Sequence, residues 1–236
     1  MARSFNGSSD LASFSPSIAG FNVLSLSFWM LLPTNPTSEK VAIVGIAPFG
    51  GSSFDFEPRD ITNGIASMTM TGPPGFWVDT FTQATANVWH HYLAIYSRVG
   101  PTNTLYIDGL PITMTARVHN AGSYGNFADS GPWYLMDYPT GGAAWFTAGS
   151  MAELAAWGGV TITASEAVSL AAGASPVSVH PDGLTFYVPM HGGDSPEPDY
   201  SGNKYNATLT GTSYVPHPRV QPGILLPNRV GQGGRV

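Results

Sequence analysis

The chain has 236 residues and a formal net charge of −6; 10% of its residues are charged, 12% are aromatic and none is cysteine. The lack of cysteine excludes disulfides and thiolate metal sites, and the charge gives no basic surface for nucleic acid or anionic lipid. Abundant glycine (28) and proline (20) with few charges is typical of short strands separated by turns. We therefore expect one main all-β domain that binds no nucleic acid and does not insert into a membrane, since no apolar run approaches the roughly 18 residues that a span needs.

The N-terminal part of the chain predicts three strands. Residues 4–10 run from a strand end into a Gly/Ser/Asp turn, and in residues 24–31 apolar side chains alternate with small ones. Pro33 ends that second strand, because proline cannot donate a hydrogen bond to a central ladder. Residues 41–46 form a short apolar run before Pro48, which is typical of a third strand.

The next part of the chain predicts strands separated by exposed loops. Residues 54–57 and 66–71 alternate in the period-two manner of half-buried strands. Gly72-Pro73-Pro74-Gly75 is a strong turn signal before a further strand at 76–78.

Residues 87–112 predict the centre of a sheet. Both faces of residues 88–96 are apolar, which indicates a central strand covered on both sides, so Trp89→Ala should cost roughly 3–5 kcal/mol. Residues 100–103 form a turn, 104–107 resume a strand, and Asp108-Gly109 supplies hairpin chemistry.

The following segment predicts a long surface loop at 116–131 and one short helix at 162–173. Thr163 or Ser165 can cap that helix, and Gly173 ends it.

The C-terminal part divides into the end of the domain and an arm. Residues up to 213 complete a domain at 1–213. Residues 214–236 are dense in proline and glycine and are expected to form an extended arm. Its expected contacts, with other copies of the chain or with a particle shell protein, are Arg219, Ile224, Leu225, Leu226 and Arg229.

Several motifs together resemble one family. They are Phe5-Asn6-Gly7-Ser8-Ser9-Asp10, Leu24-Ser25-Leu26-Ser27-Phe28-Trp29, Trp89-His90-His91 with Leu105-Tyr106-Ile107-Asp108-Gly109, Gly149 to Trp157, and Asp199-Tyr200-Ser201-Gly202-Asn203. This set resembles laminin G-like domains of the concanavalin A-like lectin/glucanase superfamily, and the last motif is similar to the tail of phage-encoded members. The resemblance implies an antiparallel jelly-roll β-sandwich with one short helix and with strands at 133–136 and 149–157. It ends at Thr212, before the arm at 214–236.

Three functions follow as hypotheses from that resemblance. The leading one is a non-enzymatic structural or decoration protein on the surface of a bacteriophage-like particle, with a lectin-like fold that offers adhesion to cell-surface glycans. The alternatives are a free carbohydrate-binding lectin and a glycoside hydrolase. Residues 1–5 show no basic-then-apolar signal sequence, so we expect synthesis in a host cytoplasm and final placement on the virion.

Aromatic rings in loops are the candidate glycan contacts. Such rings stack on sugar faces, and they lie here among Gly, Asn and Ser: Trp77, Tyr124, Trp133, Tyr138 and Trp145. The competing interpretation for each is core packing, to which Trp29, Trp89 and Trp157 are assigned.

Calcium is the only cofactor that the sequence leaves open. The family often holds Ca²⁺ with acidic residues at its rim, and Asp194, Glu197 and Asp199 supply oxygen ligands in one loop. The alternative, which we favour, is that these acids cap turns.

Catalytic interpretations have little support. His90 and His91 are adjacent on a strand, so they point to opposite faces and cannot hold one ion together. Asp55 and Glu57 have the spacing of a glycosidase pair, but Arg59 follows them and can neutralise a surface cluster. We therefore predict no enzymatic activity.

Overall fold

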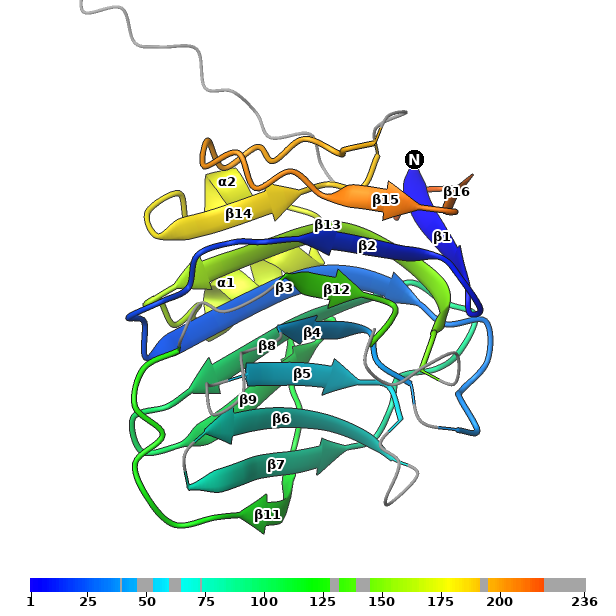
Figure 1. Ribbon diagram of the computed structural model, residues 1–236. Helices are drawn as coiled ribbons and strands as arrows, with labels where there is room; N and C mark the ends of the chain where they lie inside the picture. Colours follow the sequence, from blue (N-terminus) through cyan, green and yellow to red (C-terminus); the bar gives the residue numbers. More distant parts are fainter. Residues whose placement is uncertain are drawn as a thin grey trace, which may run out of the picture.

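Two antiparallel β-sheets face each other in the computed structural model, which describes residues 1–38, 40–45, 53–59, 65–72, 74–127, 132–138, 145–191 and 195–218. Figure 1 shows the strands of one sheet, sheet B, from β11 at the bottom to β15 at the top, with the second sheet, sheet A, behind it. The predicted all-β antiparallel sandwich is confirmed.

Sheet A contains eight strands within the described residues. Its path runs β10 (Leu110–Pro111), β9 (Thr102–Ile107), β8 (His90–Ser97), β3 (Val23–Leu31), β13 (Ala148–Gly158), β1 (Ala2–Asn6) and β16 (Ser213–Val215), and β14 (Leu184–Val188) also pairs with β13. Strands β3 and β13 pair with each other at the centre of this sheet; the other edge of β3 pairs with β8, and the other edge of β13 pairs with β1 and β14.

Sheet B also has eight strands in the described part of the chain. Its order is β11 (Thr115–His119), β7 (Gly75–Phe81), β6 (Ala66–Gly72), β5 (Ser53–Glu57), β4 (Ile43–Gly45), β12 (Trp133–Leu135), β2 (Leu11–Phe14) and β15 (Thr208–Thr210). Alternate side chains of these strands point toward sheet A, which is the periodicity that the sequence shows at 54–57 and 66–71.

Aromatic rings fill the space between the sheets. Phe28 of β3 is fully buried, stacks on Tyr92 with ring centroids 5.4 Å apart and meets Phe56 of sheet B edge to face at 5.2 Å. Phe54 meets Trp133 in the same manner at 4.6 Å. Such pairs contribute about 0.5–1.5 kcal/mol each beyond the apolar area that they bury.

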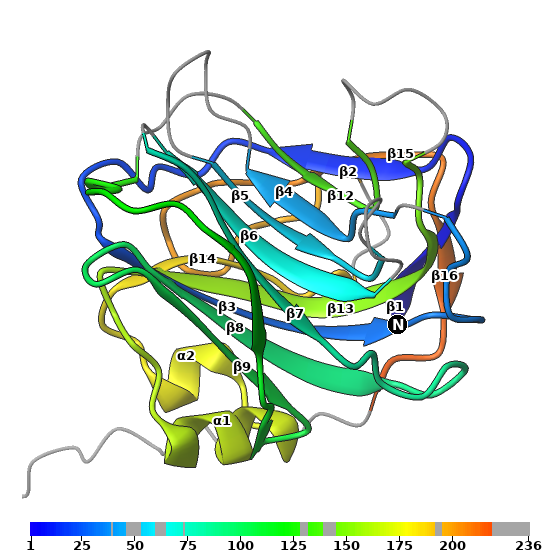
Figure 2. The ribbon, with the colours of Figure 1, turned by 90° about the horizontal axis from the view of Figure 1, so that it is seen from below.

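A second, smaller core lies on the other face of sheet A. Helices α1 (Ala164–Ala171) and α2 (Pro176–Val179) cover that face, opposite to sheet B (Figure 2). Trp157 is fully buried there, and its indole N–H donates to the carbonyl oxygen of His180 at 2.6 Å. Thr163 caps α1 through a reciprocal capping box with Glu166, which confirms the predicted helix and its cap.

The Asp108-Gly109 turn is confirmed as a two-residue hairpin. It joins Ile107 to its partner Leu110, and both turn residues have positive φ, 52° and 77°. Asp108 also accepts hydrogen bonds from the His91 amide at 2.9 Å and from His90 Nδ1 at 2.6 Å. The turn is thereby tied to the start of β8.

The structure corrects four details of the sequence interpretation. Strand β8 begins at His90; Val88 is 49% exposed and Trp89 is only half-buried, so the predicted cavity cost of Trp89→Ala is too large. The start of the predicted 116–131 loop is strand β11, because it pairs with β7 along the edge of sheet B. Helix α2 was not expected, although Pro176 at its first turn is a recognised start signal.

The fourth detail concerns the predicted arm. Tyr214 and Val215 pair with β1 in β16, so the sheet continues past residue 213. His217 then lies 3.0 Å from the Glu153 carboxylate, which also accepts the Tyr187 hydroxyl. Glu153 sits at a bulge of β13 with φ +53°, at the point where β13 changes partner from β1 to β14. The chain is therefore fastened to sheet A up to Pro218, and the remaining arm lies outside the described residues.

No helix within the described ranges combines the length and the apolar character that crossing a bilayer requires.

Candidate functional site

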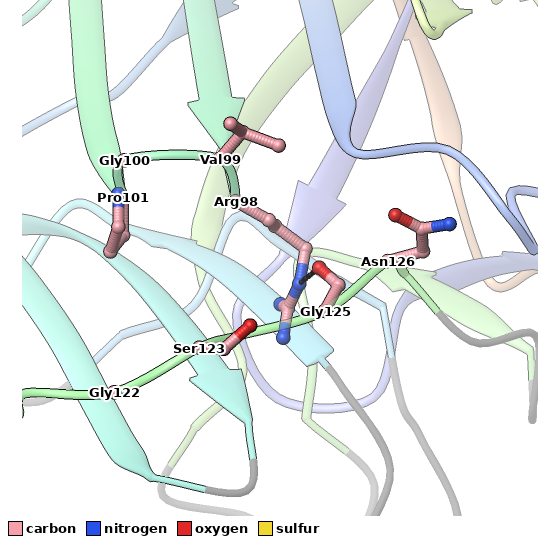
Figure 3. A pocket seen from close by; sticks show the side chains of 8 residues that line it. All are labelled: Arg98, Val99, Gly100, Pro101, Gly122, Ser123, Gly125 and Asn126. Carbon is pink, nitrogen blue, oxygen red and sulfur yellow. Dashed lines mark hydrogen bonds between the residues drawn. The ribbon is translucent and has the colours of Figure 1, made fainter.

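A pocket opens at one end of the sandwich, between the β8–β9 turn and the loop that follows β11 (Figure 3). Its volume is about 570 Å³, within the range of small-molecule sites. The residues that line it are Arg98, Val99, Gly100, Pro101, Gly122, Ser123, Gly125 and Asn126. We call this the loop pocket.

Arg98 holds the backbone of the pocket in place through hydrogen bonds to carbonyl oxygens. Its Nε donates to the carbonyl oxygens of Tyr124 at 3.2 Å and Gly125 at 3.0 Å, Nη2 donates to Tyr124 at 2.6 Å, and Nη1 donates to Thr71 at 3.2 Å. The guanidinium also lies 4.9 Å from the centre of the Phe127 ring. Burial lowers the pKa of Arg98 to about 10, so the group stays cationic at neutral pH. One side chain thus fixes the loop against sheet B.

Tyr124 joins the pocket to an aromatic stack at the edge of sheet B. Its ring is buried, lies 5.4 Å from the Arg98 guanidinium and meets the Trp77 ring edge to face at 6.1 Å. Its hydroxyl donates to the Asn120 carbonyl at 3.3 Å. The structure places Tyr124 beneath the loop, so it supports the pocket and offers little ring surface to a ligand.

Trp77 forms a rigid pair with His119. The two rings are nearly parallel, with centroids 3.6 Å apart and an angle of 10° between their planes. The buried Asp79 carboxylate accepts from Trp77 Nε1 at 3.1 Å, from His119 Nε2 at 2.8 Å and from Asn103 Nδ2 at 3.0 Å. Because Trp77 is half-buried and His119 is exposed, the stack is a fixed aromatic surface next to the loop.

The other predicted aromatic contacts lie elsewhere. Trp133 is 2% exposed and packs among Phe54, Phe186 and Phe14, so its ring faces belong to the core. Tyr138 and Trp145 are half-buried and stack on each other with centroids 4.8 Å apart. Their segments join β12 to β13, whereas the loop pocket adjoins the end of β6 through Thr71. The five candidates therefore do not form one site.

The predicted calcium ligands are engaged in other contacts where the structure describes them. Glu197 is fully buried and pairs with Arg3, with the Nε–Oε1 distance at 3.1 Å. Asp199 accepts from the amides of Tyr187, Ser201 and Tyr205 at 2.8–3.0 Å, which is the turn-capping role that we favoured. Asp194 lies outside the described residues, among which no group of three potential metal ligands occurs.

The His90–His91 pair takes part in packing. His90 contacts Asp108, whereas His91 is buried against Ser27 on the other face of β8, with His91 Nε2 2.9 Å from Ser27 Oγ. Burial lowers the pKa of His91 to about 4. Asp55 and Glu57 share the outer face of β5, and Glu57 accepts from Ser67 at 3.1 Å. The predicted assembly contacts Arg219, Ile224, Leu225, Leu226 and Arg229 all lie outside the described residues.

The sequence interpretation missed Arg98 and the loop pocket. The available signal was an arginine at the end of an apolar strand, directly before a Gly-Pro turn. That signal is weak, because its partners are backbone carbonyls about 26 residues away, which leave no pattern in the sequence.

Fold and site together define a lectin-type β-sandwich with a ligand-sized pocket among its end loops. A family model, described as the concanavalin A-like lectin/glucanases superfamily in its laminin G-like form, matches residues 6–167. The chain therefore belongs to this superfamily, and the predicted laminin G-like resemblance is confirmed. No curated protein matches the chain.

Solved structures with a similar fold include proteins of several kinds. A putative carbohydrate binding protein from Bacteroides ovatus is 17% identical with a TM-score of 0.62, over 90% of this chain and 59% of that one. Domain 4 of an arabinanase from Geobacillus stearothermophilus, solved with arabinotriose, is 18% identical with a TM-score of 0.53, over 72% of this chain and 76% of that domain. The tailspike protein 2 enzymatically active domain of Bacteriophage CBA120 is 13% identical with a TM-score of 0.51, over 76% of this chain and 28% of that one. At these identities the likeness establishes the fold alone.

Proposed function

We propose that this protein is a non-enzymatic carbohydrate-binding module that holds a glycan in the loop pocket. The observation that carries the proposal is the pocket's lining, which combines hydrogen-bonding and small apolar side chains on a braced loop. Two similar folds support it, since one is described as a putative carbohydrate binding protein and the other was solved with arabinotriose.

The lining suits the two surfaces of a sugar ring. The hydroxyl of Ser123 and the amide of Asn126 can exchange hydrogen bonds with sugar hydroxyls, and Val99 and Pro101 can contact the C–H face. Arg98 fixes the backbone that carries Ser123 and Asn126 before any ligand arrives. Such preorganisation reduces the entropy that is lost on binding.

A binding role fits the pocket better than hydrolysis. Glycoside hydrolysis generally uses two carboxyl groups that flank the scissile bond. The described residues that line the pocket include neither aspartate nor glutamate. Asp55 and Glu57 lie instead on the outer face of β5.

Display on a bacteriophage-like particle, the leading hypothesis from the sequence, stays a prediction. The residues that should make its assembly contacts lie outside the described part of the chain. Incorporation of the full chain and of a 1–218 truncation into particles would test it, with loss of incorporation expected for the truncation.

A glycan array tests the proposed function. The full chain should bind a subset of oligosaccharides, and Ser123→Trp should abolish that binding, because it places a large ring on an exposed position inside the pocket. Ser8→Trp is the matched control, because Ser8 is also exposed and follows Gly7, which lies against Ala148 at the first residue of β13. The pocket is at the opposite end of this sheet, where Gly158 pairs with Leu24 and Val23 pairs with Ser97, the residue before Arg98.

Two outcomes would contradict the proposal. One is equal loss of binding in Ser123→Trp and Ser8→Trp, and the other is no binding of the full chain to any glycan. Release of reducing sugar from the bound oligosaccharides would show instead that the protein is a hydrolase.

A further inference from the structure

We propose that the loop pocket selects neutral glycans over glycans that carry carboxylate or sulfate groups. This inference rests on the proposed function and specifies the class of ligand. It depends on two observations: the Arg98 guanidinium is bonded to the loop backbone, and the other side chains that line the pocket are uncharged.

Arg98 is the charged side chain among the described residues that line the pocket, and its charge is directed away from a ligand. The side chain is 3% exposed. Its three nitrogens donate to the carbonyl oxygens of Thr71, Tyr124 and Gly125, and the guanidinium plane lies near the rings of Tyr124 and Phe127. Figure 3 shows the guanidinium against the 122–126 segment, with a hydrogen bond to Gly125. An acidic sugar could reach these donors only by displacing the loop.

The remaining lining groups are uncharged. An ionised carboxylate or sulfate that leaves water needs charge-assisted hydrogen bonds from a cation, as arginine and lysine supply at acidic-ligand sites. The described lining offers a serine hydroxyl, an asparagine amide and backbone groups in that role. These groups match neutral sugar hydroxyls, which both donate and accept.

Charge beyond the pocket acts in the same direction. The whole chain carries a formal charge of −6, so an acidic glycan approaches against repulsion. The Asp79 carboxylate contacts Trp77, whose ring meets Tyr124 of the loop. Long-range attraction from Arg98 is therefore opposed by the field of the protein.

The test compares the binding of two glycans that have the same sugar sequence, one neutral and one negatively charged. Calorimetry with the full chain would use a neutral oligosaccharide that the array identifies and its carboxylated or sulfated counterpart, at low and at physiological salt. We expect the neutral form to bind at least about tenfold more tightly at both salt concentrations, a difference of about 1.4 kcal/mol.

A charge-introducing variant makes the test specific. Ser123→Lys places a solvent-accessible cation in the pocket and should raise the affinity for the acidic form by on the order of tenfold, an increase that salt reduces. Ser8→Lys adds the same charge next to Gly7, which lies against the first residue of β13 at the end of the sheet away from the pocket, and should not change the ratio of the two affinities. Melting temperatures of both variants show whether each is folded.

The outcomes separate this inference from the function on which it rests. Equal or tighter binding of the acidic form to the unmodified chain would overturn the selectivity and leave carbohydrate binding intact. An unchanged ratio in a folded Ser123→Lys variant would show that charge at the pocket does not set selectivity. Failure to bind either form would overturn the proposed function itself.

Discussion

The buried ion pair between Arg3 and Glu197 gives a sharp prediction for stability. Arg3 lies on β1 and Glu197 in the segment before β15; their side chains are 5% and 0% exposed, and Nε and Oε1 are 3.1 Å apart. Arg3→Met removes the cation and leaves a carboxylate that has no access to water. Breaking a buried pair from one side costs roughly 3–5 kcal/mol. Because a domain's whole stability is about 5–15 kcal/mol, this would be a large fraction.

Urea denaturation followed by tryptophan fluorescence measures the effect, since the chain has 6 tryptophans. Arg3→Met should lower the unfolding free energy by that amount. The double variant Arg3→Met/Glu197→Leu should recover much of it, because neither charge of this pair is then left buried without its partner. Lys204→Met removes an exposed cation and should stay within about 0.5 kcal/mol of the unmodified chain. A single variant at Arg3 that is as stable as the Lys204→Met control would refute the reasoning.

The same ion pair predicts the response to calcium. Because Glu197 is occupied by Arg3 and Asp199 by backbone amides, neither chelator nor added Ca²⁺ should change the melting temperature. Stabilisation by Ca²⁺ that disappears in Asp199→Asn would show that the acids of this loop do bind the ion.

Three further predictions follow from other buried groups. The pKa of His91 is about 4 in the folded chain, below its unfolded value of 6.5, so the unfolded state binds the extra proton first as the pH falls. The free energy of unfolding should be highest above pH 6.5 and drop by roughly 3 kcal/mol between pH 6.5 and 4. Denaturation of His91→Gln checks the assignment, because this drop should be absent in that variant. Thr163→Ala removes the side-chain half of the capping box of α1 and should cost about 1 kcal/mol in chemical denaturation, whereas an equal loss in Ser178→Ala would point to a general effect. Trp89→Ala should cost less than Trp157→Ala, for which roughly 3–5 kcal/mol is expected, because Trp89 is half-buried and Trp157 is fully buried; the reverse order in melting experiments would contradict this.

The sequence predicted the elements whose determinants are local. The capping box of Thr163 and Glu166, three residues apart, defines the start of α1, and Asp108-Gly109 needs only its own positive φ values to form the hairpin. The pattern of 54–57 likewise placed a strand with Phe54 and Phe56 facing inward. Each signal lies within a few residues of the feature that it predicts.

The missed features depend on contacts between distant segments. Strand β11 has little apolar periodicity, and its pairing with β7 is what makes it a strand. Arg98 holds the 122–126 segment by donating to its backbone carbonyl oxygens. Every residue has such an oxygen, so the sequence does not show which residues accept these hydrogen bonds. Trp133 and Trp77 look alike as tryptophans near turns, yet the sheet order sends the first into the core and the second to an edge. The candidate site could therefore be located only from the three-dimensional arrangement of the two sheets.

The pairing order of sheet A also governs when the protein can fold during its synthesis. Strand β3 hydrogen-bonds with β8 and β13, and β1 cannot pair with β13 until residues 148–151 exist. At about 5–20 residues per second, the first strand waits roughly seven to thirty seconds for its partner. During that interval the apolar side chains of Leu24, Leu26 and Phe28 have only part of their final cover. Production of soluble protein in a cell should therefore respond to growth temperature and chaperone supply, and a variant that is more stable once folded need not give a higher yield.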